Sequence, residues 1–202
     1  MKLYYTPGAC SLASHIALRE AGYQFDLEQV DLAAKKTKSG ADYTKVNAKG
    51  YVPALQLDNG EVLTEGPIIL QYLADQKPES GLVPKAGTME RYRTQEWLNF
   101  VTSELHKGFG ILFNPALPEA ARPVVVDKLG SRLDFLAKQL DGKPYLTGDK
   151  FTAPDAYAFT VLSWAPHLKV SLDKWPTLKA YVERIAGRPQ VQAALKAEGL
   201  VK

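Results

Sequence analysis

Residues 50–67, GYVPALQLDNGEVLTEGP, decide the fold of the first part of the chain. Two short apolar runs flank Asn59-Gly60, and Asn-Gly is the strongest local signal for a β-hairpin because both residues tolerate positive φ. The sequence EGP at residues 65–67 then predicts the start of a helix that continues through Leu73. We therefore expect two antiparallel strands followed by a helix.

The residues before this stretch alternate between strand and helix patterns. Residues 2–5 are typical of a short buried strand, and the helix after them is one that Ser11 can cap and Gly22 can end. Residues 25–29 then alternate in polarity as a strand does. The predicted order over the first eighty residues is strand, helix, strand, irregular piece, hairpin, helix.

The remainder of the chain shows a linker and then only helical patterns. Residues 77–88, KPESGLVPKAGT, contain two prolines and two glycines that interrupt regular structure. Beyond them, four leucines from Leu129 to Leu140 form one apolar helical stripe. Thr152 and Asp155 have the spacing of a capping box, and this structural role for Asp155 is preferred over a catalytic one. We predict three segments, with boundaries at 1–77 for an α/β domain, 78–88 for the linker and 89–202 for an all-helical domain.

Composition limits the classes of function. The formal net charge is +3 and the basic residues are scattered, so no nucleic-acid partner is expected. The chain starts without the apolar stretch of a signal peptide, and no run approaches the roughly 20 apolar residues that span a bilayer, which predicts a cytoplasmic protein with no membrane partner. A single cysteine, Cys10, cannot form an internal disulfide or a cysteine-rich metal site, so no metal is predicted.

Cys10 follows a predicted strand and directly precedes the next helix. Free N–H groups and the helix dipole at that position favour a thiolate, and can lower a cysteine pKa from about 8.5 into a range of roughly 3.5–7.5. The alternative is a small buried hydrophobic residue, and the sequence around Cys10 leaves both interpretations open. No Cys-x-x-Cys pair exists, which excludes a dithiol redox cycle within one chain.

Two further features are suited to recognising a peptide. Proline normally interrupts strand pairing, yet Pro53 precedes an apolar strand, and a cis bond would let Val52 offer its N–H and C=O to an extended peptide. The helix start at Glu65-Gly66 offers N–H groups to a carboxylate, while Glu65 can accept from an ammonium. The alternatives are a trans edge proline and a favourable first-turn charge.

Together these motifs resemble the glutathione transferase family, and within it the bacterial beta class, over essentially the whole chain. PGACS at residues 7–11 and ELHK at residues 104–107 are the parts specific to the beta class, and Gly66 stands where many other classes have a serine. The resemblance implies a thioredoxin-like α/β domain that binds glutathione, followed by an all-α domain. The stretches that carry it are YYTPGACS (4–11), GYVPAL (50–55), LTEG (63–66), EWLNF (96–100), SELHK (103–107) and FTAPDAY (151–157).

The resemblance also implies which residues contact glutathione. Val52, before a cis Pro53, would pair with the cysteinyl backbone, Glu65-Gly66 would hold the γ-glutamyl end, and Lys35 would reach the glycine carboxylate. Cys10 would lie beside the glutathione sulfur and be able to form a mixed disulfide. His106, which the sequence alone favours as a helix-face histidine, becomes a second catalytic candidate, a donor or base suited by its near-neutral reference pKa. The binding set is completed by Asn99, Ser103, Glu104 and Lys107, with Tyr5 and Ser11 in support.

The leading hypothesis is an enzyme that transfers the glutathione thiol to an electrophilic small molecule, with a role in detoxification. Glutathione would be a co-substrate, no other cofactor is expected, and the superfamily implies a homodimer. The alternatives are a monothiol, glutaredoxin-like redox enzyme that uses Cys10, and a ligand-binding protein with residual catalysis.

Overall fold

The computed structural model describes residues 1–201, and the chain forms two compact units. The first comprises Met1–Lys85 together with the segment from Arg188 onward, and the second comprises Ala86–Gly187. The predicted division at 1–77, 78–88 and 89–202 stays a prediction. It differs from the compact units chiefly in the segment from Arg188 onward, which packs within the first unit because α8 contacts α1.

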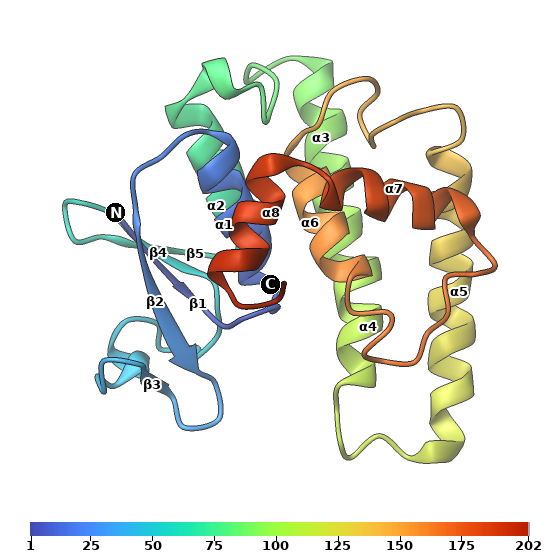
Figure 1. The fold of residues 1–202 in the computed structure, drawn as a ribbon, viewed down its shortest axis with the longest axis horizontal. Helices are drawn as coiled ribbons and strands as arrows, with labels where there is room; N and C mark the ends of the chain where they lie inside the picture. Colours follow the sequence, from blue (N-terminus) through green and yellow to red (C-terminus); the bar gives the residue numbers. More distant parts are fainter. Residues whose placement is uncertain (202) are drawn as a thin grey trace. The chain divides into compact units, whose positions relative to one another are not determined.

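The first unit is built on a five-stranded mixed sheet (Figure 1). This is one strand more than predicted, because residues 36–37, in the stretch expected to be irregular, also form a short strand. β1 pairs with β2 in parallel, and the other neighbouring strands are antiparallel. The strand order is β3-β2-β1-β4-β5, formed by β1 (Lys2–Tyr5), β2 (Asp26–Asp31), β3 (Lys36–Thr37), β4 (Ala54–Gln56) and β5 (Val62–Thr64).

Three helices complete this unit, and two of them, α2 and α8, pack against the third, α1. The contacts of α1 with α2 and α8 bury Leu12 and Ile16 of α1 and Leu70 of α2, each at most 1 % exposed (Figure 1). Burial of such aliphatic side chains is the main source of stability for the unit. The helices are α1 (Ser11–Glu20), α2 (Gly66–Gln76) and α8 (Pro189–Ala197), with 3₁₀ turns at Tyr43–Lys45 and Pro78–Ser80.

The predicted hairpin is confirmed, with one difference at its turn. β4 and β5 pair antiparallel, and Gly60 has a φ of 90°. Asn59 does not use positive φ; its side-chain oxygen accepts from the Glu61 N–H at 3.0 Å, and its amide donates to the Glu61 carboxylate. The Gly60 N–H donates to the Leu57 carbonyl, so the loop is one residue longer than a two-residue turn.

The second unit is all-helical, as predicted. The four leucines between Leu129 and Leu140 are all buried on α5 or at its end, and the capping box of Thr152 and Asp155 begins α6. Every residue of α6 is buried, and α6 contacts α3 and α7. The elements are α3 (Met89–Phe100), a π-helical segment (Val101–His106), α4 (Lys107–Leu112), a 3₁₀ turn (Glu119–Ala121), α5 (Arg122–Gln139), α6 (Ala153–Leu162) and α7 (Pro176–Ala186).

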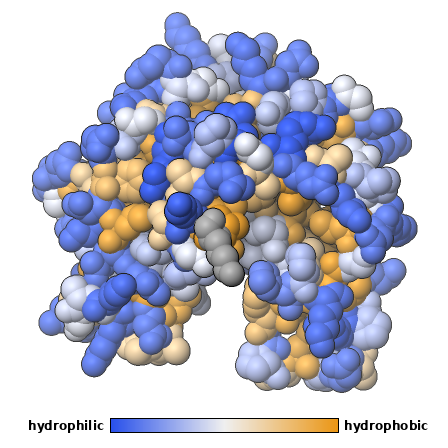
Figure 2. Space-filling view, in the orientation of Figure 1, coloured by the Kyte–Doolittle hydropathy of each residue, from blue (hydrophilic) through white to orange (hydrophobic). Residues whose placement is uncertain are grey.

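Hydrophilic side chains cover much of the face in Figure 2, with smaller apolar areas between them. Among residues 1–201, no helix combines the length and the apolar character needed to cross a bilayer.

Candidate active site

Cys10 directly precedes α1, as predicted, and occupies its N-cap position. Its Sγ is 3.2 Å from the Val52 carbonyl oxygen, to which the thiol donates. The side chain is half-buried, and the loop before it turns through Gly8 at a φ of +70°. The first unit therefore brings together the thiol and the residue that precedes Pro53, which are 42 positions apart in the sequence.

The prediction that Ser11 caps α1 is wrong. Cys10 already has helical φ and ψ of −58° and −19°, which makes Ser11 the first residue of the helix. The Ser11 hydroxyl is fully buried, accepts from the Thr6 N–H at 3.2 Å and donates to the Thr6 carbonyl. Ser11 therefore supports the loop before Cys10 and does not cap the backbone after it.

The Val52–Pro53 peptide bond is cis, as predicted. Val52 is buried in a cluster with Tyr4, Val30 and Tyr43. The Tyr43 hydroxyl also donates to the Tyr51 carbonyl at 2.7 Å, which fixes the chain just before Val52. Pairing of Val52 with a ligand backbone stays a prediction.

Lys35 and Glu65 are held by the segment just before Val52. The Lys35 ammonium donates to the Gly50 carbonyl at 2.9 Å, and the Glu65 carboxylate forms an ion pair with Lys49. Glu65 has a φ of +70° immediately before Gly66 starts α2, a conformation that costs a non-glycine residue about 1–3 kcal/mol. Such backbone strain is concentrated at functional sites.

A buried network missed by the sequence analysis supports the loop that leads to Cys10. One Glu198 carboxylate oxygen accepts from the Gly8 N–H at 2.9 Å, and the other is 2.8 Å from His15 Nδ1. Because the Arg19 Nε donates to His15 Nε2 at 2.9 Å, the His15 proton is on Nδ1 and is donated to Glu198. His15 and Arg19 are one helical turn apart, but no local signal points to Glu198.

In the second unit, the predicted residues follow one another along α3, the π-helical segment and the start of α4. Asn99 is on α3, and its carbonyl accepts from the Ser103 hydroxyl at 3.0 Å. Glu104 already forms an ion pair with Arg132 of α5 at 2.7 Å. Single π-helical turns inside α-helices are frequent at functional sites. Lys107 is the first residue of α4.

His106 is the last residue of the π-helical segment. Its pKa was expected to be near neutral, and the structure contradicts that expectation. Burial, followed by the charge of Lys107, lowers its pKa to about 4. Its Nδ1 is 2.6 Å from the Tyr157 hydroxyl, and its ring packs edge-on against Trp164 with centroids 5.0 Å apart. His106 is therefore neutral at pH 7 and can offer one hydrogen-bond donor and one acceptor.

Comparison with known proteins agrees with this geometry. Residues 8–76 match the model of the glutathione S-transferase N-terminal domain, and residues 100–189 match that of the C-terminal domain. Glutathione S-transferase GstA of Escherichia coli O157:H7 is 50% identical over 200 residues, which cover 99% of this chain and 100% of that protein. The chain belongs to the glutathione S-transferase family.

Two solved structures indicate the class of this glutathione S-transferase within the family. The bacterial beta class enzyme of Sphingomonas chungbukensis is 50% identical and superposes with a TM-score of 0.96, over 100% of both chains. A sphingomonad glutathione S-transferase complexed with glutathione is 48% identical, with a TM-score of 0.95 over 100% of both chains. The beta-class resemblance and the fold of a thioredoxin-like domain followed by a helical domain are thereby confirmed.

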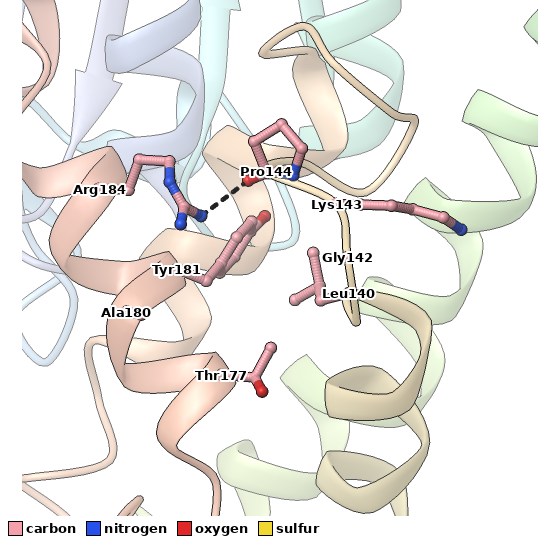
Figure 3. A pocket seen from close by; sticks show the side chains of 8 residues that line it. All are labelled: Leu140, Gly142, Lys143, Pro144, Thr177, Ala180, Tyr181 and Arg184. Atoms are coloured by element: carbon pink, nitrogen blue, oxygen red, sulfur yellow. Dashed lines mark hydrogen bonds between the residues drawn. The ribbon is translucent and has the colours of Figure 1, made fainter.

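A groove in the second unit contains none of the predicted site residues of the transferase. Figure 3 shows it between α7 and the loop after α5, where Lys143 points away and Arg184 donates to the Pro144 carbonyl at 3.1 Å. On α7, the Tyr181 hydroxyl donates to the Asp155 carboxylate at 2.8 Å. The groove has a volume of about 380 Å³ and is lined by Leu140, Gly142, Lys143, Pro144, Thr177, Ala180, Tyr181 and Arg184.

Asp155 has the structural role that its sequence position predicts. Its carboxylate accepts from the Thr152 N–H at 2.8 Å and from the Leu146 N–H at 2.9 Å, as well as from Tyr181. Burial raises the pKa of Asp155, while these hydrogen bonds act in the opposite direction. All its partners tie the start of α6 to the preceding loop and to α7, so Asp155 stays outside the candidate site.

Proposed function

We propose that this glutathione S-transferase binds glutathione along Val52, with its γ-glutamyl end at Glu65-Gly66 and its glycine carboxylate at Lys35. The observation that carries the proposal is the contact between the Cys10 thiol and the Val52 carbonyl. A tripeptide whose cysteine pairs with Val52 brings its own sulfur close to Cys10 and to the N-terminus of α1. Pro53, Tyr5 and Ser11 support this surface, and the further binding residues proposed are Asn99, Ser103, Glu104, His106 and Lys107.

The proposed reaction is conjugation of glutathione to an electrophilic small molecule, in the role of detoxification. N–H groups and the dipole at the start of α1 favour the glutathione thiolate. Cys10 lies at the same helix N-terminus and is the proposed catalytic residue beside the glutathione sulfur. The thiolate attacks an electrophilic carbon, a carbon–sulfur bond forms, and the leaving group departs with the bond's electrons. The thiol proton is released to solvent. Glutathione is the co-substrate in this scheme.

Thiol–disulfide exchange is a second candidate function at Cys10, supported by its half-buried thiol at the start of a helix. The Cys10 thiolate would attack a glutathione mixed disulfide, release the other thiol and form a bond to the glutathione sulfur. A second glutathione thiolate would then attack that bond, release Cys10 and leave as glutathione disulfide. The chain has no second cysteine, so a monothiol cycle is the form of exchange open to it.

The variant Cys10→Ala separates these two reactions. Conjugation to a chlorodinitrobenzene acceptor should fall by about tenfold or less, a barrier change near 1.4 kcal/mol, because the helix N-terminus still favours the thiolate. Glutathione-dependent disulfide reduction should be abolished, because it needs a protein sulfur. Both activities are measured by steady-state kinetics on the purified full chain.

Cys10→Ser is the matched control, since its hydroxyl can still donate to the Val52 carbonyl. It should conjugate at least as well as Cys10→Ala and show no reductase activity. Near-total loss of conjugation in both folded variants would make Cys10 essential to transfer, against the proposed division of roles. Unchanged reduction in either variant would exclude Cys10 from the redox cycle.

A further inference from the structure

A buried tyrosine contacts the His106 side chain. Tyr157 lies within α6, is 3 % exposed, and brings its hydroxyl to 2.6 Å from His106 Nδ1. The two rings meet edge to face at 87°, with centroids 5.8 Å apart, and Trp164 packs against His106 as well. Because every residue of α6 is buried, Tyr157 is fixed, and it in turn fixes the orientation of the imidazole.

A neutral imidazole carries its proton on one nitrogen only, so the contact admits two arrangements. Either His106 Nδ1–H donates to the Tyr157 oxygen, or the Tyr157 hydroxyl donates to a bare Nδ1. The two atoms are 2.6 Å apart. A phenolic hydroxyl is a stronger donor than an imidazole N–H, and the bare nitrogen of a neutral imidazole is a much stronger acceptor than a phenolic oxygen. The chemistry of the two groups therefore favours the hydroxyl as donor.

We propose that Tyr157 is a positioning residue that holds His106 as the Nε2–H tautomer, so that His106 serves the transferase as a hydrogen-bond donor and not as a base. Within residues 1–201, Tyr157 is the only hydrogen-bonding partner of the His106 side chain, and Nε2 has none. This N–H is suited to an anionic sulfur or oxygen, such as the glutathione thiolate or the negative charge that develops on an attacked electrophile. The step from tautomer to catalysis rests on the proposed function.

The tautomer can be measured without any activity assay. The chain has three histidines, so ¹H–¹⁵N spectra of the imidazole nitrogens can be assigned with single His variants. At pH 7 the full-length protein should show a pyridine-type Nδ1 and a pyrrole-type Nε2 for His106. Tyr157→Phe should shift the His106 signals toward a mixture of tautomers. Tyr23→Phe is the control, since it removes a hydroxyl that donates to the Leu73 carbonyl at 2.8 Å.

Kinetics then test the donor role. His106→Gln keeps an N–H near the Nε2 position and cannot act as a base, so it should retain conjugation within about threefold, whereas His106→Phe should lose about tenfold or more. Tyr157→Phe should lower kcat by about three- to tenfold, with a smaller change in the KM for glutathione. Thermal unfolding of each variant confirms that it is folded.

Two outcomes would overturn the proposal. One is an Nδ1–H tautomer of His106 in the unmodified protein, and the other is a folded His106→Gln variant as inactive as His106→Phe, which would point to a base. Absence of conjugation in the unmodified protein would refute the proposed function instead, and the spectra would still decide the tautomer.

Discussion

Lys35 and Glu65 show how single residues of the candidate site are held by neighbouring groups of the chain. The Lys35 ammonium is bound to the Gly50 carbonyl, and a side chain at Gly50 would come within 3.1 Å of Lys35. Glu65 is paired with Lys49 and has positive φ. Both charges are therefore anchored to the chain just before Val52, which reduces the entropy lost when they bind the ends of a tripeptide.

Lys35→Ala and Glu65→Ala should each raise the KM for glutathione, because each removes a charge-assisted contact worth roughly 1.5–3 kcal/mol. The KM for the electrophile should change less, and Lys36→Ala, at an exposed neighbouring position, should change neither constant. Steady-state kinetics with each substrate varied in turn measures both. Equal effects on the two constants would indicate that Lys35 and Glu65 stabilise the fold and do not bind glutathione.

At the scale of elements, α8 and α1 are joined by charged and polar groups as well as by apolar packing. Arg188, just before α8, forms a two-pronged ion pair with Glu20 at the end of α1, at 2.7 and 2.8 Å. Glu198, just after α8, binds His15 of α1 and the N–H of Gly8. The two ends of α8 are thus tied to α1 and to the loop that leads to Cys10.

Glu198→Ala should lower the free energy of unfolding by roughly 2–5 kcal/mol, because it removes the buried acceptor of the Gly8 and His15 N–H groups. Chemical denaturation followed by circular dichroism measures the change. Glu183→Ala, at an exposed position on α7, is the control and should stay within about 0.5 kcal/mol. A change as small as the control's would show that the network contributes little to stability.

At the scale of the whole molecule, we propose the homodimer and the cytoplasmic location that the superfamily implies. Each unit exposes apolar side chains that association could cover. Tyr51 and Ile68 are 67 % and 49 % exposed in the first unit, and Met89 and Tyr92 are 64 % and 57 % exposed in the second. Contiguous apolar surface is typical of protein interfaces, and we propose that these side chains contribute to one.

Sedimentation equilibrium should give twice the 22.2 kDa mass of the chain. Met89→Lys should weaken the association, because a buried unpaired charge opposes it. Val124→Lys, at a position 71 % exposed on α5, is the matched control and should leave the mass unchanged. A single-chain mass for the unmodified protein at micromolar concentration would contradict the dimer.

The sequence by itself determined the features whose causes are local. Gly60 supplies the positive φ of the hairpin, Thr152 and Asp155 are three residues apart in the capping box, and the leucines of α5 repeat with the helical period. Residues adjacent along the chain are sufficient to specify such elements, and the motif at Val52-Pro53 likewise predicted the cis bond.

Only the tertiary structure decided how the candidate site is charged and supported. Glu198 reaches His15 and Gly8 across 183 and 190 positions, and Ser11 binds Thr6 where a helix cap was expected. The pKa of His106 is about 4, far from the near-neutral value expected from the residue type, because burial penalises the charged imidazole. Desolvation and long-range pairing depend on which distant residues surround a group, and no spacing along the chain encodes them.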